Sequence, residues 1–222
     1  MRLIYTYYCR PGDHINRQQN TGLVLWDACY LLGRLLESLE ARTPNYVKSK
    51  RCLDLGAGTG LLSIVAWLLG AETVVATDIG DAVELLASNI TSNVDRIAAG
   101  RDGGHAASKP PVTAELWWGE GFAAEAGEGE RAELNQPFDL VFCSEVIYNA
   151  DGHGPLLKCL AAVTRPGSVI LMSYKFRGLD ESSFVDSFKK NKEYKVREIP
   201  KGMLDPEFVH ETEIKVLRAV RL

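Results

Sequence analysis

A glycine-rich segment in the first third of the chain carries the strongest chemical signal in this sequence. It reads Asp-Leu-Gly-Ala-Gly-Thr-Gly over residues 54–60 and follows a short apolar run that begins at Arg51. Glycines directly after a strand allow a tight turn and a close approach of the backbone to a ligand. The helix that follows offers unpaired N–H groups at its start. We therefore expect a ligand site with Gly56, Gly58 and Gly60 in its wall.

The spacing inside this segment narrows the class of ligand. A dinucleotide-binding G-x-G-x-x-G fingerprint would need a third glycine at position 61, which is Leu. A Walker phosphate-binding loop would need Gly-Lys-Ser/Thr, which does not follow here. Asp54 precedes the first glycine by two residues and would repel a diphosphate, whereas it can face an ammonium or a sulfonium. The segment therefore predicts a cationic ligand without a diphosphate.

A second acidic residue, Asp78, ends the next β-branched run, which starts at Thr73. A carboxylate at a strand end can accept two hydrogen bonds from ribose hydroxyls. The alternative interpretation is that Asp78 only caps the helix that follows. A cationic group, a ribose and the absence of a phosphate together indicate S-adenosyl-L-methionine as the cofactor.

The elements that must position these residues alternate along the chain. Apolar periodicity predicts helices over residues 26–40, 61–69, 83–94, 156–163 and 182–190. Short β-branched or apolar runs predict strands over residues 51–55, 73–77, 112–118, 138–143, 168–174, 194–199 and 213–220. This alternation predicts an α/β fold with an open, seven-stranded, mainly parallel Rossmann-like sheet and helices on both faces. The last two strands are expected to form an antiparallel terminal hairpin.

One domain accounts for most of the chain length. We expect an N-terminal segment over residues 1–22 and an S-adenosylmethionine-dependent domain over residues 23–222. Residues 95–111 are rich in Gly, Ala and Pro and predict an exposed loop insertion. Residues 119–137 are acidic and rich in Ala and Gly, which predicts a second, mobile excursion.

Several motifs, taken in their order, resemble those of a known family. The glycine loop followed by Asp78 is similar to that of the seven-strand (class I) S-adenosylmethionine methyltransferases. More specific segments resemble the non-SET protein-lysine methyltransferases: G-L-V-L-W-D-A at 22–28, Asn89 with Asn93, L-W-W-G-E at 116–120 and S-E-V-I-Y at 144–148. The resemblance extends from about Gly22 to Val220, apart from the two excursions. Within the family, it is greatest to the lysine methyltransferases whose substrate is valosin-containing protein.

The resemblance implies a set of cofactor-binding residues at matching positions. They are Trp26, Gly56, Ala57, Gly58, Asp78, Trp118 and Ser144. Trp118 would cover the adenine ring, since an aromatic face suits a neutral base. Core filling is the alternative for Trp26 and Trp118. Trp117 and Trp67 are expected in the core.

The acid-x-x-Tyr segment implies the reaction centre, with Glu145 and Tyr148 as catalytic residues. A lysine nucleophile has a reference pKa of about 10.4 and must lose its proton before it attacks. An apolar channel and a nearby sulfonium lower that pKa, whereas a carboxylate raises it. Glu145 is therefore expected to bind and orient the amine, and Tyr148 to line its channel. The family most often has Asp at this position, and Lys175 would add a cation near the mouth.

Composition limits the other classes of function. The net charge of −4 and pI near 5.6 lack the basic footprint of a nucleic-acid-binding protein. Five scattered cysteines and four isolated histidines form no metal or disulfide pattern, and Cys29, Cys52, Cys143 and Cys159 are expected to be buried thiols. The longest apolar stretch is too short to span a bilayer. We expect a reduced, soluble protein of the cytoplasm, with the nucleus as a second location.

The expected partner is a protein substrate, such as an AAA ATPase or another chaperone-like protein, and the expected state is a monomer. No nucleic-acid, membrane or metal partner is expected. Three alternatives stay open: a small-molecule methyltransferase on the same fold, a nucleic-acid methyltransferase and a non-catalytic binding module. The second would place Pro-Pro-aromatic where Ser144–Tyr148 stand, and the third conflicts with the intact glycines and Asp78.

Overall fold

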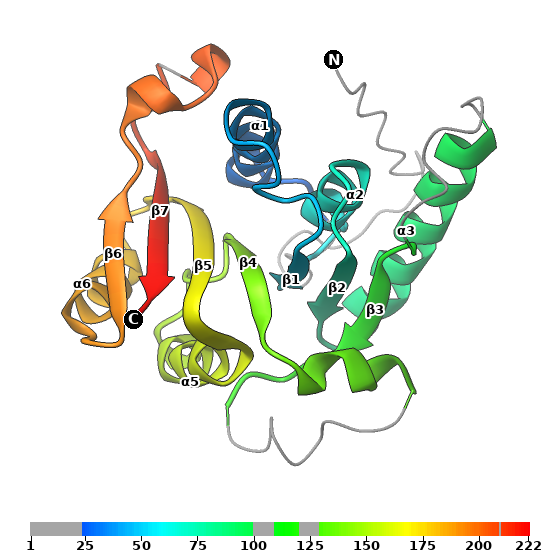
Figure 1. The fold of residues 1–222 in the computed structure, drawn as a ribbon. Coiled ribbons are helices and arrows are strands. Elements are labelled where there is room, and N and C mark those ends of the chain that lie inside the picture. The colour runs from blue at the N-terminus through cyan, green and yellow to red at the C-terminus, as the bar shows by residue number, and fades with distance from the viewer. Residues whose placement is uncertain (1–23, 100–108, 120–128, 209) are drawn as a thin grey trace.

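A computed structural model describes residues 24–99, 109–119, 129–208 and 210–222 of the chain (Figure 1). The expected N-terminal segment, residues 1–22, lies outside the described residues. So do the middle part of the first predicted excursion and residues 120–128 of the second.

The described chain forms one seven-stranded sheet in the order β3-β2-β1-β4-β5-β7-β6. Its strands are β1 (Arg51–Leu55), β2 (Thr73–Asp78), β3 (Val112–Glu115), β4 (Phe138–Ser144), β5 (Thr164–Lys175), β6 (Tyr194–Glu198) and β7 (Ile214–Arg221). The first five strands pair in parallel. β7 is antiparallel to both β5 and β6, so the predicted terminal hairpin and the mainly parallel sheet are confirmed.

Helices cover both faces of this sheet (Figure 1). The helices are α1 (Asp27–Arg42), α2 (Leu61–Leu68), α3 (Asp81–Ala99), α5 (His153–Val163) and α6 (Glu181–Lys190). On one face, leucines of α1 and α2 pack against Phe142, Leu171 and Val216. On the other face, α5 and α6 pack against Val141, Ile170 and Leu217. Each strand in the centre therefore buries both of its faces, which explains why the parallel strands read as continuous apolar runs.

A smaller apolar cluster joins α2 and α3 over β2. It consists of Ala57, Ile64, Ala76, Leu86 and Ile90. This cluster holds the glycine loop between β2 and the two helices. The position of the loop therefore depends on side chains that come from both sides of it in the sequence.

Three boundaries differ from those that the sequence predicts. α3 continues to Ala99, so the first five residues of the predicted loop over 95–111 are helical. β3 ends at Glu115 rather than Trp118. β5 begins at Thr164, ahead of Pro166-Gly167, because a bulge opposite Phe138 accommodates these residues and Ser168 Oγ donates a 2.6 Å hydrogen bond to the Phe138 carbonyl.

The predicted mobile excursion over 119–137 is wrong for its last part. Residues 129–135 form a 3-10 helix, η2 (Gly129–Asn135). Leu134 is only 5% exposed and belongs to the core on the α5 and α6 face. Glu133 Oε2 pairs with Arg51 Nη1 at 2.8 Å at the start of β1. One apolar side chain and one ion pair thus fix this segment, although its composition is typical of a loop.

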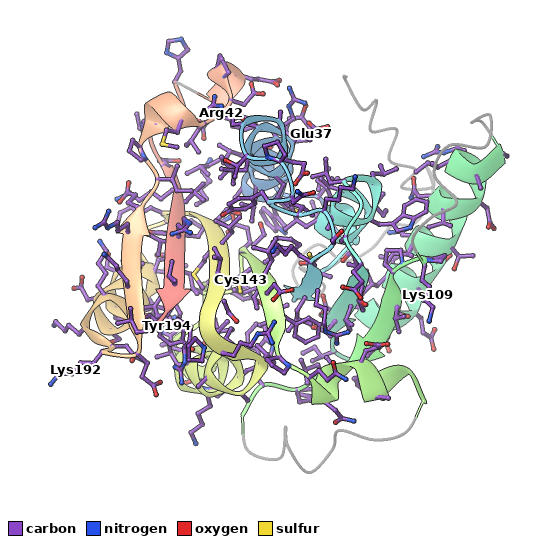
Figure 2. The ribbon with its side chains drawn as sticks, viewed as in Figure 1. Glu37, Arg42, Lys109, Cys143, Lys192 and Tyr194 are labelled. Atoms are coloured by element: carbon purple, nitrogen blue, oxygen red, sulfur yellow. The ribbon has the colours of Figure 1, made fainter. Side chains whose placement is uncertain are left out.

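The described cysteines form no disulfide. Cys52, Cys143 and Cys159 are buried, as predicted, and Figure 2 shows Cys143 on β4 inside the sheet. Cys29 is half-buried.

Candidate active site

A cavity of about 590 Å³ opens at the carboxyl edge of the sheet, above the ends of β1 and β4. The strand order of the sheet reverses between β1 and β4: β2 and β3 lie on one side of β1, and β5 lies on the far side of β4. Ligands of open α/β sheets bind at this kind of reversal in strand order. The wall comes from six places in the chain: residues 24–26 with Cys29, Asp54 with 56–59 and Leu62, residues 78–82, Trp117, residues 144–146 with Tyr148, and Arg177 with Leu179.

The glycine loop forms the floor of the cavity with an unusual backbone. Gly56 and Gly58 have φ values of 67° and 53°, in the left-handed region that favours glycine. A Cβ on Gly56 would lie 2.9 Å from Val146 Cγ1, which is too close for a side chain. The Gly58 N–H donates to Asp78 Oδ2 at 2.8 Å. The loop therefore brings its backbone into the cavity wall at Gly56 and Gly58, and Ala57 and Thr59 line the cavity beside them.

Gly60 does not line the cavity. Its φ is 84°, and a Cβ there would lie 2.8 Å from Leu86 Cδ1 of α3. Gly60 therefore has a packing role at the start of α2, and its contact with the cofactor stays a prediction.

The two adjacent tryptophans differ in exposure. Trp117 is 59% exposed and lines the cavity, so its predicted place in the core is wrong. Trp118 is half-buried and packs against the core, and its ring lies 3.6 Å from the position that a Cβ on Gly56 would take. Trp118 therefore supports the glycine loop, and its contact with the adenine ring stays a prediction. Trp67 is buried in the core, as predicted.

Asp54 is a buried carboxyl group in the cavity wall, with only 1% exposure. The backbone N–H and the hydroxyl of Ser63 both donate to Asp54 Oδ2, at 3.1 and 2.8 Å. Burial nevertheless raises the pKa of Asp54 to about 7. A cationic ligand would offset this effect because it favours the carboxylate. The structure thus places an acid where the sequence predicts one for a cationic cofactor.

Asp78 presents a carboxylate that is oriented by the backbone. Oδ2 accepts from the Gly58 N–H at 2.8 Å and Oδ1 from the Ile79 N–H at 2.9 Å. Both donors precede α3, which begins at Asp81, so these bonds do not cap that helix. Burial raises the pKa of Asp78, and the two N–H donors oppose that effect. Each oxygen keeps a lone pair that a ribose hydroxyl could use.

The other side of the cavity is built from residues after β4. Ser144, Glu145 and Tyr148 all line it, as the sequence predicts for residues that act together. Glu145 has a φ of 56°, in the left-handed region that a non-glycine residue adopts uncommonly. Its N–H donates to the Ser173 carbonyl at 2.9 Å, and Ser173 Oγ donates to Ser144 Oγ at 3.0 Å. The end of β4 is thus tied to β5 directly beneath the cavity.

Arg177 is a cavity residue that the sequence did not identify. Its Nη1 lies 2.6 Å from Glu145 Oε2, and its guanidinium lies 5.2 Å from the ring centroid of Trp26. Lys175, which the sequence placed near the mouth, points elsewhere, because its Nζ pairs with Glu213 at 3.3 Å and Glu211 at 3.8 Å. The cation at the cavity is therefore Arg177. The one available signal was its place in the loop after β5, at the edge where ligands bind.

These residues fit the predicted cofactor. The backbone of the glycine loop and the buried carboxyl group of Asp54 can face the sulfonium and the amino acid end of S-adenosylmethionine. The carboxylate of Asp78, at the end of β2, can face its ribose. Within the part of the chain that the structure describes, no group of acidic, His or Cys side chains could hold a metal ion. Over the same residues, no helix is long and apolar enough to cross a membrane.

Methyltransferases are among the solved structures that share this arrangement of strands and helices. An O-methyltransferase from Bacillus cereus in complex with SAH aligns with a TM-score of 0.56 at 12% identity, over 92% of this chain and 86% of its own. Magnesium protoporphyrin IX methyltransferase from Synechocystis PCC 6803 with bound SAM aligns at 0.55 and 15% identity, over 90% and 86%. At these identities the likeness establishes the fold.

Sequence relatives are more specific. The chain is 34% identical to protein N-lysine methyltransferase METTL21A of Mus musculus, over 78% of this chain and 70% of that protein. It is 29% identical to METTL21A of Danio rerio, over 89% and 77%, and 31% identical to the protein-lysine N-methyltransferase EFM6 of Saccharomyces cerevisiae, over 73% and 65%. A family model described as lysine methyltransferase matches residues 14–191. The chain therefore belongs to the lysine methyltransferase family.

Proposed function

We propose that this protein transfers a methyl group from S-adenosylmethionine to the ε-amine of a lysine in a protein substrate, and that the 590 Å³ cavity is its active site. One observation carries this assignment. The cavity joins a cofactor side, with the glycine loop, Asp54 and Asp78, to an amine side with Glu145 and Tyr148. The names of the relatives support a protein substrate rather than a metabolite.

When bound, S-adenosylmethionine would supply a methyl carbon on a sulfonium, which a neutral amine would attack: an N–C bond would form, the C–S electron pair would return to the leaving sulfur, and the amine would release its proton to water. The residues of the chain supply position and environment for this displacement. Asp54 places negative charge against the cationic cofactor. Glu145 accepts a hydrogen bond from the amine, and Tyr148 lines its path.

The finer partner assignments are part of the proposal. The substrate would be an AAA ATPase or another chaperone-like protein, and the enzyme would act as a monomer in the cytoplasm or the nucleus. The resemblance of the Gly22–Val220 region to the methyltransferases of valosin-containing protein supports this choice of substrate.

Labelled cofactor and cell lysate test the proposal. Wild-type enzyme is expected to label protein, and acid hydrolysis of the labelled band should release methyl-lysine. Glu145→Gln should lose most of this labelling while its affinity for S-adenosylmethionine, measured by calorimetry, changes little, because the substitution keeps the shape and removes the charge. Tyr148→Phe should lose less, and Tyr148→Ala more, because only the second removes the ring.

Glu207→Gln is the matched control, since Glu207 is exposed and lies outside the cavity wall. It should label protein at the wild-type rate. If Glu145→Gln also labelled at that rate, the amine site would be wrongly placed. Label in a small metabolite instead of protein would favour a small-molecule methyltransferase.

A further inference from the structure

Arg177 pairs with the same carboxylate to which the amine-binding role is assigned. Its Nη1 lies 2.6 Å from Glu145 Oε2. The Glu145 side chain is 8% exposed and that of Arg177 is 29% exposed, so the pair is shielded from solvent more than an ordinary surface ion pair. The guanidinium also donates to the Lys175 carbonyl at 3.1 Å and stacks on the ring of Trp26. Three contacts thus hold the guanidinium against Glu145.

The surrounding loop fixes both members of the pair. Glu145 Oε1 accepts from the Lys175 N–H at 3.0 Å, so one carboxylate oxygen has a partner at the end of β5 and the other has Arg177, which follows β5. Glu181, which is buried at the start of α6, accepts from the Leu179 N–H at 2.9 Å and from the Arg177 N–H at 3.3 Å. The backbone on each side of Arg177 is therefore anchored, which separates this contact from a chance approach of two long side chains.

The charges around the pair are otherwise acidic. Among the described residues that line the cavity, Arg177 is the one cationic side chain, against the carboxyl groups of Asp54, Asp78, Asp81 and Glu145. The other titratable groups that face it are Cys29 of α1 and Tyr148 after β4. Outside the wall, Glu181 of α6 lies behind the pair, and Lys175 of β5 is paired away with Glu211 and Glu213. Without Arg177, an entering lysine would meet only negative charge.

We propose that Arg177 is a positioning residue that neutralises Glu145, so that the cavity accepts the substrate lysine as the uncharged amine that can attack the methyl group. This inference rests on the proposed function. A lone carboxylate beside an amine stabilises the ammonium form, which cannot act as a nucleophile, whereas a carboxylate paired with a guanidinium does so much less. Glu145 can then orient the amine through a hydrogen bond without holding its proton.

A charge series tests this role through the pH dependence of methyl transfer. Initial rates of labelled methyl incorporation into lysine of heat-treated lysate protein are measured from pH 6.5 to 10. Arg177→Gln leaves Glu145 without its guanidinium partner, which should raise the pKa of the substrate amine. The rising limb of the profile should therefore move to higher pH by about one unit, the effect of one charge at a partly buried site. Arg177→Lys keeps the charge and should stay close to the wild type.

Removal of the other partner should act in the opposite direction. Glu145→Gln leaves an unpaired guanidinium, so the profile should move to lower pH while the rate falls. The double variant Glu145→Gln/Arg177→Gln carries neither charge, and its limb should return towards that of the wild type. Opposite shifts followed by cancellation are not expected from damage to the loop alone, which would lower all rates without moving the limb.

A binding measurement without methyl transfer provides a second readout. The probe is n-butylammonium at pH 7.5, whose binding is followed by broadening of its proton NMR signals. Arg177→Gln should bind this cation about tenfold more tightly than the wild type, because the freed carboxylate attracts it, and Arg177→Lys should not. Calorimetry with S-adenosylmethionine on the same samples verifies that each variant is folded.

Two results would overturn the role of Arg177. The first is a pH–rate profile of Arg177→Gln whose rising limb lies at the same pH as that of an active wild type, whatever the maximal rate of the variant. The second is equal affinity of the two proteins for n-butylammonium. Failure of the proposed function has a different signature, namely that the wild type binds S-adenosylmethionine but methylates no lysine, and that result would overturn both.

Discussion

Asp54 is a carboxyl group on which burial and ligand charge act in opposite directions. Its side chain is almost completely buried, and burial raises its pKa to about 7 even with two hydrogen bonds from Ser63. A cation bound in the cavity would favour the ionised form. The protonation of this one residue is therefore coupled to binding of the cofactor.

This coupling predicts a pH-dependent affinity for S-adenosylmethionine. As pH falls through about 7, Asp54 gains a proton and loses the charge that attracts the cofactor. If only the ionised form binds well, the apparent Kd should rise about tenfold between pH 8 and pH 6, in proportion to the loss of that form. Calorimetry at pH 6, 7 and 8 measures it.

Asp54→Asn is the control for that experiment, because Asn keeps an acceptor for Ser63 and cannot ionise. The variant should bind more weakly at pH 8 and lack the additional pH dependence. Titration of the cofactor itself affects both proteins equally. An equal slope in both would show that Asp54 does not contact the cationic part of the cofactor.

Asp78 has a different role, since its two oxygens are held by backbone N–H groups and face the cavity. Asp78→Ala should weaken binding of S-adenosylmethionine by about 1.5–3 kcal/mol, the range for a hydrogen bond to a charged group. The loss should be measured by calorimetry. Asp95→Ala, on an exposed position of α3, should bind as the wild type does, and unchanged affinity in Asp78→Ala would place the ribose elsewhere.

At the scale of elements, the turn from β1 into α2 depends on glycines for two separate reasons. Gly56 and Gly58 bring the backbone into the cavity wall with positive φ values, whereas Gly60 lets α2 start close to α3. At Gly60 a side chain would meet Leu86 at 2.8 Å and Ile90 at 3.1 Å. The same loop is therefore constrained from the ligand side and from the helix side.

Gly60→Ala should lower the melting temperature more than Gly80→Ala. Both positions have a positive φ, 84° and 54°, but a Cβ on Gly80 meets no atom within 4 Å. Gly80→Ala thus adds about 1–2 kcal/mol of backbone strain alone, whereas Gly60→Ala adds overpacking of about 1–3 kcal/mol. Thermal unfolding by circular dichroism, without cofactor, should show a difference of several degrees. Equal losses would mean that α3 moves away without resistance.

At the scale of the whole molecule, the two faces of the sheet have separate tasks. The face covered by α1, α2 and α3 adjoins the cavity, since α1 and the β1–α2 loop contribute to its wall. The opposite face is closed by α5 and α6 through a row of aromatic rings, His153, Phe184, Phe188 and Tyr194, with centroids 5.1–5.5 Å apart. Tyr194, labelled in Figure 2, ends this row at the start of β6.

Phe188→Ala should therefore reduce stability without changing the site. The side chain is fully buried, and its loss should cost about 3–5 kcal/mol and lower the melting temperature by on the order of 10 °C for a chain of this size. At 15 °C the variant should still bind S-adenosylmethionine with wild-type affinity. Phe176→Ala, at an exposed ring, is the control. A large loss of affinity in folded Phe188→Ala would show that the two faces are coupled.

Local patterns in the sequence were sufficient to predict the order of the strands and helices and the side of the candidate site that contains the glycine loop, Asp54 and Asp78. Apolar periodicity predicts each strand and helix because burial of a strand or a helix face repeats at short range. The glycine loop, Asp54 and Asp78 could be assigned because strand, turn and acid lie within one βαβ unit. The resemblance of residues 144–148 to a known family implied Ser144, Glu145 and Tyr148, which lie at and after the end of β4, the strand parallel to β1.

Tertiary structure alone decided the features that depend on which side chains meet. Trp117 and Trp118 are adjacent, and the sequence does not specify which of them faces the cavity once β3 has ended at Glu115. Arg177 lies 32 residues from Glu145 and reaches it only because β4 and β5 pair in parallel. Leu134 enters the core through a segment with loop composition. Such contacts depend on strand register and chain path, which arise from packing across the whole sheet and leave no local repeat in the sequence.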